Sequence, residues 1–78
     1  MKHEIVVPPT ADGSAEITLV SWLKEVGDSV GMGEDLAEAA TEKITLYITA
    51  PADGILQEIH VKAGEKAQVG QVVGIMSD

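Results

Sequence analysis

Apolar and polar residues alternate between positions 44 and 50 of the chain. Threonine and tyrosine separate the apolar residues Ile44, Leu46, Ile48 and Ala50. A period of two that is rich in β-branched residues is typical of a strand with one buried face. We therefore predict a half-buried strand over residues 44–50, with Lys43 in the turn directly before it.

Short apolar segments of the same kind recur along the chain between glycine and proline turns. Residues 10–14 form a loop, and Pro51-Ala52-Asp53-Gly54 is a strong turn signal. Further strands are predicted over residues 4–7, 16–23, 28–30, 55–61, 65–67 and 71–76. Many short strands with a glycine turn every several residues indicate a small all-β sandwich or barrel.

An internal repeat relates the two halves of the chain. With an offset of 37 (64 − 27), Gly27-Asp28 falls on Gly64-Glu65 without a gap, and Leu19 falls on Leu56. Two copies of one motif indicate a pseudo-two-fold domain whose halves share a single core.

The repeat decides the structure that we predict for residues 34–42. This segment is rich in Ala, Leu and Glu, so intrinsic propensity alone favours a helix. The repeat partner of residues 34–39 is the segment 71–76, which is strand-like and poor as a helix. Because tertiary context routinely overrides propensity, we predict a strand over residues 35–40.

Strands 35–40 and 44–50 then form a hairpin with Thr41-Glu42-Lys43 at its tip. The repeat gives 6 and 80 as the positions equivalent to Lys43, and these are the two chain ends. In a two-fold body the tip and the termini therefore lie at opposite ends. This layout presents the lysine outward.

The chain is short and strongly acidic. Its 78 residues correspond to one small domain, residues 1–78, which buries about 60% of the surface of its unfolded chain and has no room for a deep cleft. Thirteen acids against five lysines give a formal net charge of −8, and there is no arginine. These features disfavour nucleic acid and an anionic membrane surface as partners.

The absence of cysteine excludes disulfides, thiolate metal sites and a cysteine nucleophile. No apolar run reaches transmembrane length, and the N-terminus lacks the apolar core of a signal peptide. We expect a cytoplasmic protein; a mitochondrial matrix protein without its targeting segment would have the same features. His3 and His60 lack the spacing of a metal site, and Trp22 is expected to be a core or half-buried anchor.

Several motifs, spread over nearly the whole chain, resemble the lipoyl domains of 2-oxo acid dehydrogenase and acetoin dehydrogenase complexes. They are Val7-Pro8, Val20-Ser21-Trp22-Leu23-Lys24, Gly27-Asp28-Ser29-Val30, Asp35-Leu36-Ala37-Glu38, Thr41-Glu42-Lys43, Ala50-Pro51-Ala52-Asp53-Gly54 and Val69-Gly70-Gln71. The resemblance implies a flattened β-barrel or sandwich of two four-stranded antiparallel sheets with pseudo-two-fold symmetry, a barrel-sandwich hybrid.

The same resemblance implies that Lys43 carries lipoate through an amide, with Thr41, Glu42 and Ile44 as its recognition neighbours. Glu42 occupies a place where the family usually has Asp, and Ala40 a place that is often Glu. The missing acid at position 40 weakens the expected recognition by a modifying or partner enzyme. Related biotinyl domains have Met on both sides of their lysine, so the neighbours of Lys43 favour lipoate over biotin.

As the family implies, the domain is a monomeric, non-catalytic carrier whose arm moves acyl groups and electrons between active sites. The implied partners are a lipoate ligase or an octanoyl/lipoyl transferase, a thiamine-diphosphate dehydrogenase component, a dihydrolipoyl acyltransferase core and dihydrolipoyl dehydrogenase. The alternatives are a biotinyl carrier and an unmodified structural adaptor of the same fold. A small enzyme is the weakest hypothesis, because no nucleophile–base pair, metal set or cofactor cleft is visible.

Overall fold

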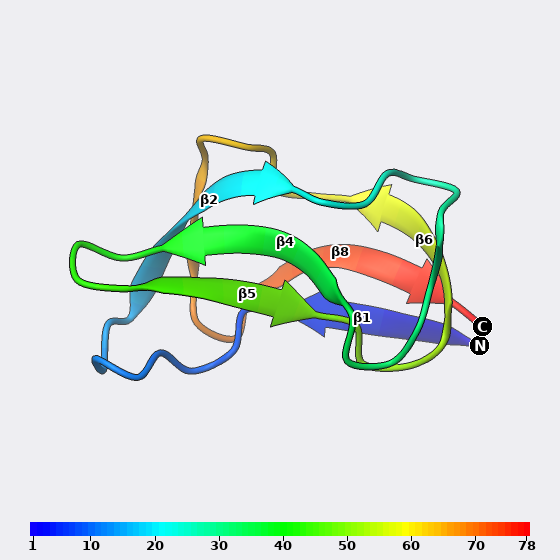
Figure 1. Cartoon of the computed structure of the whole chain (residues 1–78), viewed down its shortest axis with the longest axis horizontal. Coiled ribbons are helices and arrows are strands. Elements are labelled where there is room, and N and C mark those ends of the chain that lie inside the picture. Colours follow the sequence, from blue (N-terminus) through cyan, green and yellow to red (C-terminus); the bar gives the residue numbers. More distant parts are fainter.

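The computed structural model describes all 78 residues, and its regular elements are eight strands. They are β1 Lys2–Val6, β2 Glu16–Trp22, β3 Ser29–Val30, β4 Asp35–Ala40, β5 Thr45–Thr49, β6 Gly54–Ile59, β7 Lys66–Gln68 and β8 Val72–Ser77. One sheet has the strand order β1-β8-β6-β3 and the other β5-β4-β2-β7, and all neighbouring strands are antiparallel. The sheets form the two layers of an elongated molecule (Figure 1).

The expected pair of four-stranded antiparallel sheets is confirmed, but the sheets do not close into a barrel. No strand pairing connects one sheet to the other. The short edge strands β3 and β7, with two and three residues, each pair with a single neighbour. The molecule is therefore a sandwich with open sheet edges.

The strand predicted over residues 35–40 is confirmed as β4, in place of the helix that propensity favours. β4 is a central strand, which pairs with β2 on one edge and with β5 on the other. Leu36, Ala37 and Ala39 are fully buried in it. Pairing on both edges and burial between the layers outweigh the helix propensity of Ala and Leu.

The ends of several other strands differ by one or two residues from the prediction. The largest differences are two residues, at the start of β1 and at the end of β6, which ends at Ile59 and not at residue 61. The N–H groups of His60 and Val61 both donate to the carbonyl of Val73, so the regular ladder stops there. The same strand starts at Gly54, and this position requires a glycine because a Cβ there would overlap the backbone carbonyl of Ser77.

The predicted repeat holds in the strand pairing. Thr18 pairs with Ala40 in the first half, and Ile55 pairs with Ser77 at the equivalent positions of the second half. The turn glycines are equivalent as well, because Gly27 and Gly64 have φ angles of +99° and +90°. Each of the two donates its N–H to the leucine of the opposite half, Gly27 to Leu56 and Gly64 to Leu19.

The strands β1 and β5 are also equivalent, but with a different offset. Ile5 pairs with Gly74, and Ile48 pairs with the equivalent Ala37, which gives an offset of 43 (48 − 5) between these strands. The predicted equivalence of Lys43 with position 6 is therefore wrong, because Val6 corresponds to Thr49. Between equivalent paired positions, the chain from β1 to β2 is therefore six residues longer (43 − 37) than the chain from β5 to β6.

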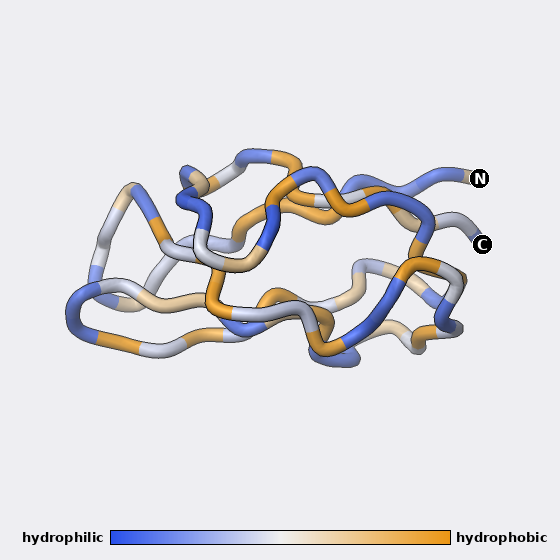
Figure 2. Tube along the Cα trace, turned by 90° about the horizontal axis from the view of Figure 1, so that it is seen from above, coloured by the Kyte–Doolittle hydropathy of each residue, from blue (hydrophilic) through white to orange (hydrophobic).

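The β4–β5 tip and the two termini lie at opposite ends of the long axis, as predicted (Figure 1). The molecule measures 33 × 19 × 17 Å, so the tip is far from the chain ends. The extremity at the tip is hydrophilic (Figure 2).

The core lies between the sheets and contains fifteen buried hydrophobic residues. The predicted alternation in β5 is confirmed, with Ile48 fully buried and Thr45, Tyr47 and Thr49 exposed. Trp22 is the expected half-buried anchor, since its ring packs against the core and its indole N–H donates to the carbonyl of Val61 at 2.7 Å.

Candidate functional site

Lys43 lies in the four-residue connection between β4 and β5, at the extremity of the hairpin. Its side chain is exposed, and it belongs to none of the ion pairs of the structure, which include Lys24 and Lys66. The amine is therefore accessible to another protein, and no side-chain ion pair has to be broken before it reacts.

The backbone of this tip is closed by a side chain. No residue at the tip has a positive φ, so the turn is not one of the tight two-residue types that fit hairpins best. The N–H of Thr41 donates to the carbonyl of Ile44 at 2.9 Å, but the N–H of Ile44 has no carbonyl acceptor. Instead, the hydroxyl of Thr41 accepts the N–H groups of both Lys43 and Ile44, each at 3.2 Å.

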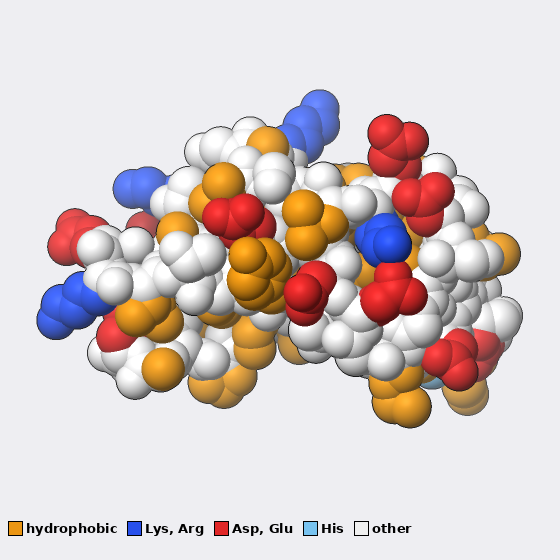
Figure 3. Space-filling view, in the orientation of Figure 1, with side chains coloured by type: hydrophobic (Ala, Val, Ile, Leu, Met, Phe, Trp, Pro, Cys, Tyr) orange, Lys and Arg blue, Asp and Glu red, His pale blue; other side chains and the backbone are white.

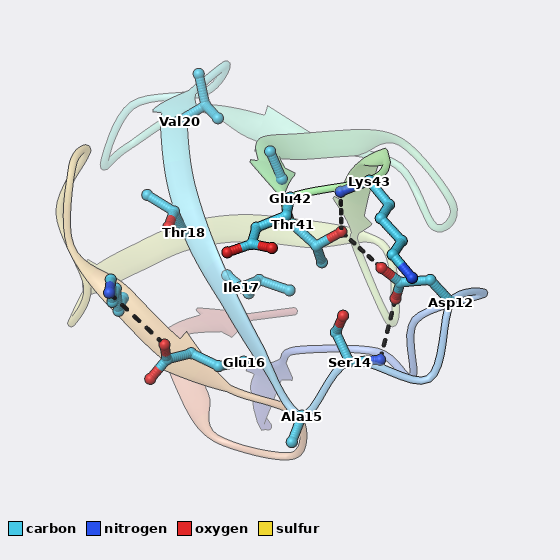
Figure 4. Close-up of a pocket in the computed structure, with 12 residues that line it drawn as sticks. Asp12, Ser14, Ala15, Glu16, Ile17, Thr18, Val20, Thr41, Glu42 and Lys43 are labelled. Atoms are coloured by element: carbon cyan, nitrogen blue, oxygen red, sulfur yellow. Dashed lines mark hydrogen bonds and ion pairs between the residues drawn. The ribbon is translucent and has the colours of Figure 1, made fainter.

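Asp12, from the long β1–β2 connection, holds this hydroxyl in place. The Thr41 hydroxyl donates to Asp12 Oδ2 at 2.8 Å, and the N–H of Ser14 donates to Asp12 Oδ1 at 3.0 Å (Figure 4). The Ser14 N–H, followed by the hydroxyls of Thr41 and Thr10, holds the pKa of the Asp12 carboxyl well below its usual range. We call the contact between Asp12 and Thr41 the carboxylate tie.

Sequence reasoning missed Asp12, because residues 10–14 were predicted only as a loop. The signal that could have found it is the difference in loop length between the two halves. Val7-Pro8 is equivalent to Ala50-Pro51, and Ala15-Glu16 is equivalent to Ala52-Asp53. Residues 9–14, which lie between these two pairs in the first half, have no equivalent in the second half. Asp12 lies inside this additional segment.

An open groove of about 590 Å³ runs between the tip, the β1–β2 connection and one side of β2 (Figure 4). It is lined by Asp12, Ser14, Ala15, Glu16, Ile17, Thr18, Val20, Ala40, Thr41, Glu42, Lys43 and Lys66. The wall is a mixture of carboxylates, amines and small apolar side chains. It forms a surface next to the lysine and not an enclosed reaction chamber.

The predicted neighbours of Lys43 lie in different environments. Glu42 is exposed at the tip and Ile44 is half-buried, whereas Thr41 belongs to the hydrogen-bond network of the turn. Ala40 ends β4 and lines the groove. Of the three recognition neighbours that the resemblance implies, Glu42 is the charged one, and it is exposed to solvent.

The histidines and the other charged residues form no second cluster in the structure. His3 contacts Asp78, and His60 contacts Glu58, so the structure does not bring the histidines together. Acidic side chains are spread over both ends of the face in Figure 3, and basic side chains project mainly at the end that carries the tip. The structure contains no helix long and apolar enough to cross a membrane.

Comparisons with known proteins agree with this geometry. The family model described as "Biotin-requiring enzyme" matches residues 3–76. The dihydrolipoyllysine-residue succinyltransferase component of the 2-oxoglutarate dehydrogenase complex from Bacillus subtilis is 41% identical over 75 residues, which cover 96% of this chain and 18% of that protein. The corresponding Rickettsia conorii protein is 36% identical over 78 residues, which cover 100% of this chain and 20% of that protein.

A solved structure shows the same fold. The lipoyl domain of the 2-oxoglutarate dehydrogenase complex from Azotobacter vinelandii superposes with a TM-score of 0.74 at 27% identity, covering 96% of this chain and 95% of the domain. This chain spans only about a fifth of the length of the curated relatives above. The chain belongs to the biotin/lipoyl family, and it is a lipoyl-type carrier domain.

Proposed function

We propose that Lys43 is the attachment site of lipoate, joined through an amide to its side-chain nitrogen. The observation that supports this proposal is the exposed lysine without an ion pair at the extremity of the hairpin, opposite the termini. Lipoyl domains of this family carry lipoate on a lysine, and the bound group supplies the two sulfurs for acyl and electron transfer. Lys43 fits that group, because an exposed amine can become a neutral amide without leaving a buried charge.

The contribution of the protein is the position of this lysine. A hairpin between two paired strands keeps the attachment point reproducible, as a site on rigid elements should be. The exposed tip leaves space around it for a large partner. Tethering raises the local concentration of the carried group at each partner without any new contact.

We propose that residues 1–78 act as one carrier domain within a 2-oxo acid dehydrogenase complex. The names of the relatives support this, since they are acyltransferase components of such complexes. The proposed partners are a lipoate ligase or an octanoyl/lipoyl transferase, a thiamine-diphosphate component, the acyltransferase core and a flavoprotein dihydrolipoyl dehydrogenase. The proposed location is the bacterial cytoplasm, in agreement with bacterial relatives.

Intact-mass spectrometry after enzymatic modification tests the proposal. The purified domain is incubated with lipoate ligase, lipoate and ATP, and in parallel with biotin ligase, biotin and ATP. We expect a lipoyl-sized mass increase in the wild type that is absent in Lys43→Arg. The matched controls Lys24→Arg and Lys66→Arg change surface lysines that lie in ion pairs, and they should keep the increase.

Two outcomes would contradict the proposal. A mass increase that persists in Lys43→Arg would place the attachment on another lysine. A biotinyl-sized increase without a lipoyl-sized one would establish the biotinyl carrier, which the comparisons do not favour.

A further inference from the structure

The two halves of the molecule differ most in the connection that reaches the lysine tip. Residues 9–14 have no equivalent in the second half, and they bring Asp12 to the β4–β5 hairpin. In the second half the shorter connection places Asp53 against the N–H of Met32, in the β3–β4 turn, at 2.7 Å. The additional segment therefore makes a contact, between Asp12 and Thr41, that has no counterpart in the second half.

The contact is directed at the backbone of Lys43. The hydroxyl of Thr41 has one hydrogen to donate and two lone pairs to accept with. Its hydrogen goes to Asp12, and both lone pairs face the N–H groups of Lys43 and Ile44. Because the acid can only accept, it fixes the direction of the hydroxyl, and the hydroxyl then has its acceptor side free for the two amides.

From this geometry we propose that Asp12 is a positioning residue for Lys43, acting through the Thr41 hydroxyl. The inference builds on the proposed attachment at Lys43. A tip held by the carboxylate tie is already ordered when a modifying enzyme docks. Without the tie, residues 42–44 have to be ordered during docking, and the cost of that order lowers the rate of modification.

The expected loss is measurable in the kinetics of lipoylation. Thr41→Val is isosteric, changes no charge and removes the hydroxyl, whereas Thr41→Ser keeps the hydroxyl. We expect kcat/KM for the domain as substrate of lipoate ligase to fall about tenfold in Thr41→Val and in Asp12→Ala, mainly through KM. Thr41→Ser should stay within about twofold of the wild type, because it restores the same hydrogen bonds.

A double-mutant cycle separates the tie from direct contacts with the enzyme. If Asp12 acts through Thr41, Asp12→Ala combined with Thr41→Val is no slower than Thr41→Val alone. Asp53→Ala is the matched control, since it removes the same charge and also breaks a carboxylate contact between two loops. It should be modified at the wild-type rate.

Amide hydrogen exchange gives a second measurement that does not depend on any enzyme. In Asp12→Ala the N–H groups of Lys43 and Ile44 should exchange about tenfold faster, while the amides of the strands keep their protection. Unchanged strand amides also show that the variant is folded. Exchange at the tip should be unaffected in Asp53→Ala.

The outcomes test the positioning role of Asp12 separately from the proposed attachment of lipoate to Lys43. No mass increase at Lys43 in the wild type would overturn the attachment proposal, whereas exchange at the tip would still test the tie. A wild type that is modified at Lys43 together with an Asp12→Ala variant of equal kcat/KM and equal exchange would overturn the inference alone. Additive losses in the double mutant would also overturn it, because Asp12 would then act independently of Thr41.

Discussion

The two ends of the sandwich are built from equivalent strands and yet have different surfaces. At the end that carries the termini, the connection between β5 and β6 is short, and Asp53 contacts a neighbouring turn. At the end that carries the tip, the chain between equivalent paired positions is six residues longer (43 − 37), and Asp12 contacts the hairpin that holds Lys43. The repeated part of the sequence forms the core, and the unrepeated part supports the site.

The repeated part is equivalent down to single hydrogen bonds. The side chain of Asp28 accepts the N–H of Glu25, and in the second half the side chain of Glu65 accepts the N–H of Lys62. Both turns are closed by an acidic side chain that accepts the N–H of the residue three positions before it, so both need an acid at this place. Such turns are therefore part of the fold, and their charges need no functional explanation.

The largest expected effect comes from the equivalent core leucines. Leu19 and Leu56 are both fully buried, so Leu19→Ala and Leu56→Ala should each lower the free energy of unfolding by about 2 to 5 kcal/mol. For a domain with a total of roughly 5 to 15 kcal/mol, either change removes a large fraction of the stability. Urea denaturation followed by Trp22 fluorescence measures both values.

Equivalence requires the two losses to be similar. The exposed Val26 in the first turn is the control, and Val26→Ala should change the free energy of unfolding by no more than about 0.5 kcal/mol. If one leucine variant lost less than half as much as the other, the halves would not share the core equally.

A smaller and more local effect is expected from removing the additional segment. Deletion of residues 9–14 makes the first connection as short as the second and leaves Val7 and Ala15, whose carbonyls accept backbone bonds from Gly70 and Val69. We expect the strand amides to keep their hydrogen-exchange protection. Lipoylation by the ligase should slow by about tenfold, as in Asp12→Ala, because the carboxylate tie is lost.

Loss of the strand amide protection in this variant would show that the segment belongs to the fold itself. A variant that folds and is modified at the wild-type rate would remove the link between loop length and the site. A deletion that is much slower than Asp12→Ala would indicate that the segment also contacts the ligase.

The repeated part of the chain could be predicted from the sequence, whereas the unrepeated segment at the site could not. The strand of residues 35–40 could be predicted in spite of its helix propensity, because its repeat partner is strand-like. The repeat also predicted the tip opposite the termini, although the equivalence of Lys43 with position 6 that it used was wrong. Asp12 could not be found in this way, since a residue without an equivalent carries no repeat signal, and its partner Thr41 is 29 positions away.

The sequence also could not predict whether the two sheets close into a barrel. Alternating apolar residues predict strands with one buried face, but the same pattern serves a sandwich and a barrel. The difference lies in the pairing at the edges, where no strand of one sheet pairs with a strand of the other. Backbone pairing at sheet edges leaves little trace in the side-chain pattern.

The smallest expected effect is the pH dependence of the tip, and its sign follows from the pKa of Asp12. Hydrogen bonds from Ser14 and Thr41 lower that pKa in the folded protein, so the ionised carboxylate is favoured there. The stabilisation by Asp12 is therefore fully present above the ordinary Asp pKa of about 3.9, and it is lost only as the pH falls through the lower folded-state value. Between pH 7 and pH 5 the carboxylate tie should stay intact.

The amide chemical shifts of Lys43 and Ile44 measure this in a pH titration, because both amides donate to the hydroxyl that Asp12 holds. We expect the main shift change well below pH 3.9, and its absence in Asp12→Asn, which cannot ionise at position 12. Glu16 and Glu42 line the same groove, so any change that remains in Asp12→Asn comes from them or from other carboxylates. A wild-type midpoint at or above the ordinary Asp value would show that the tie does not favour the ionised acid, and the distinction between the two ends would then rest on loop length alone.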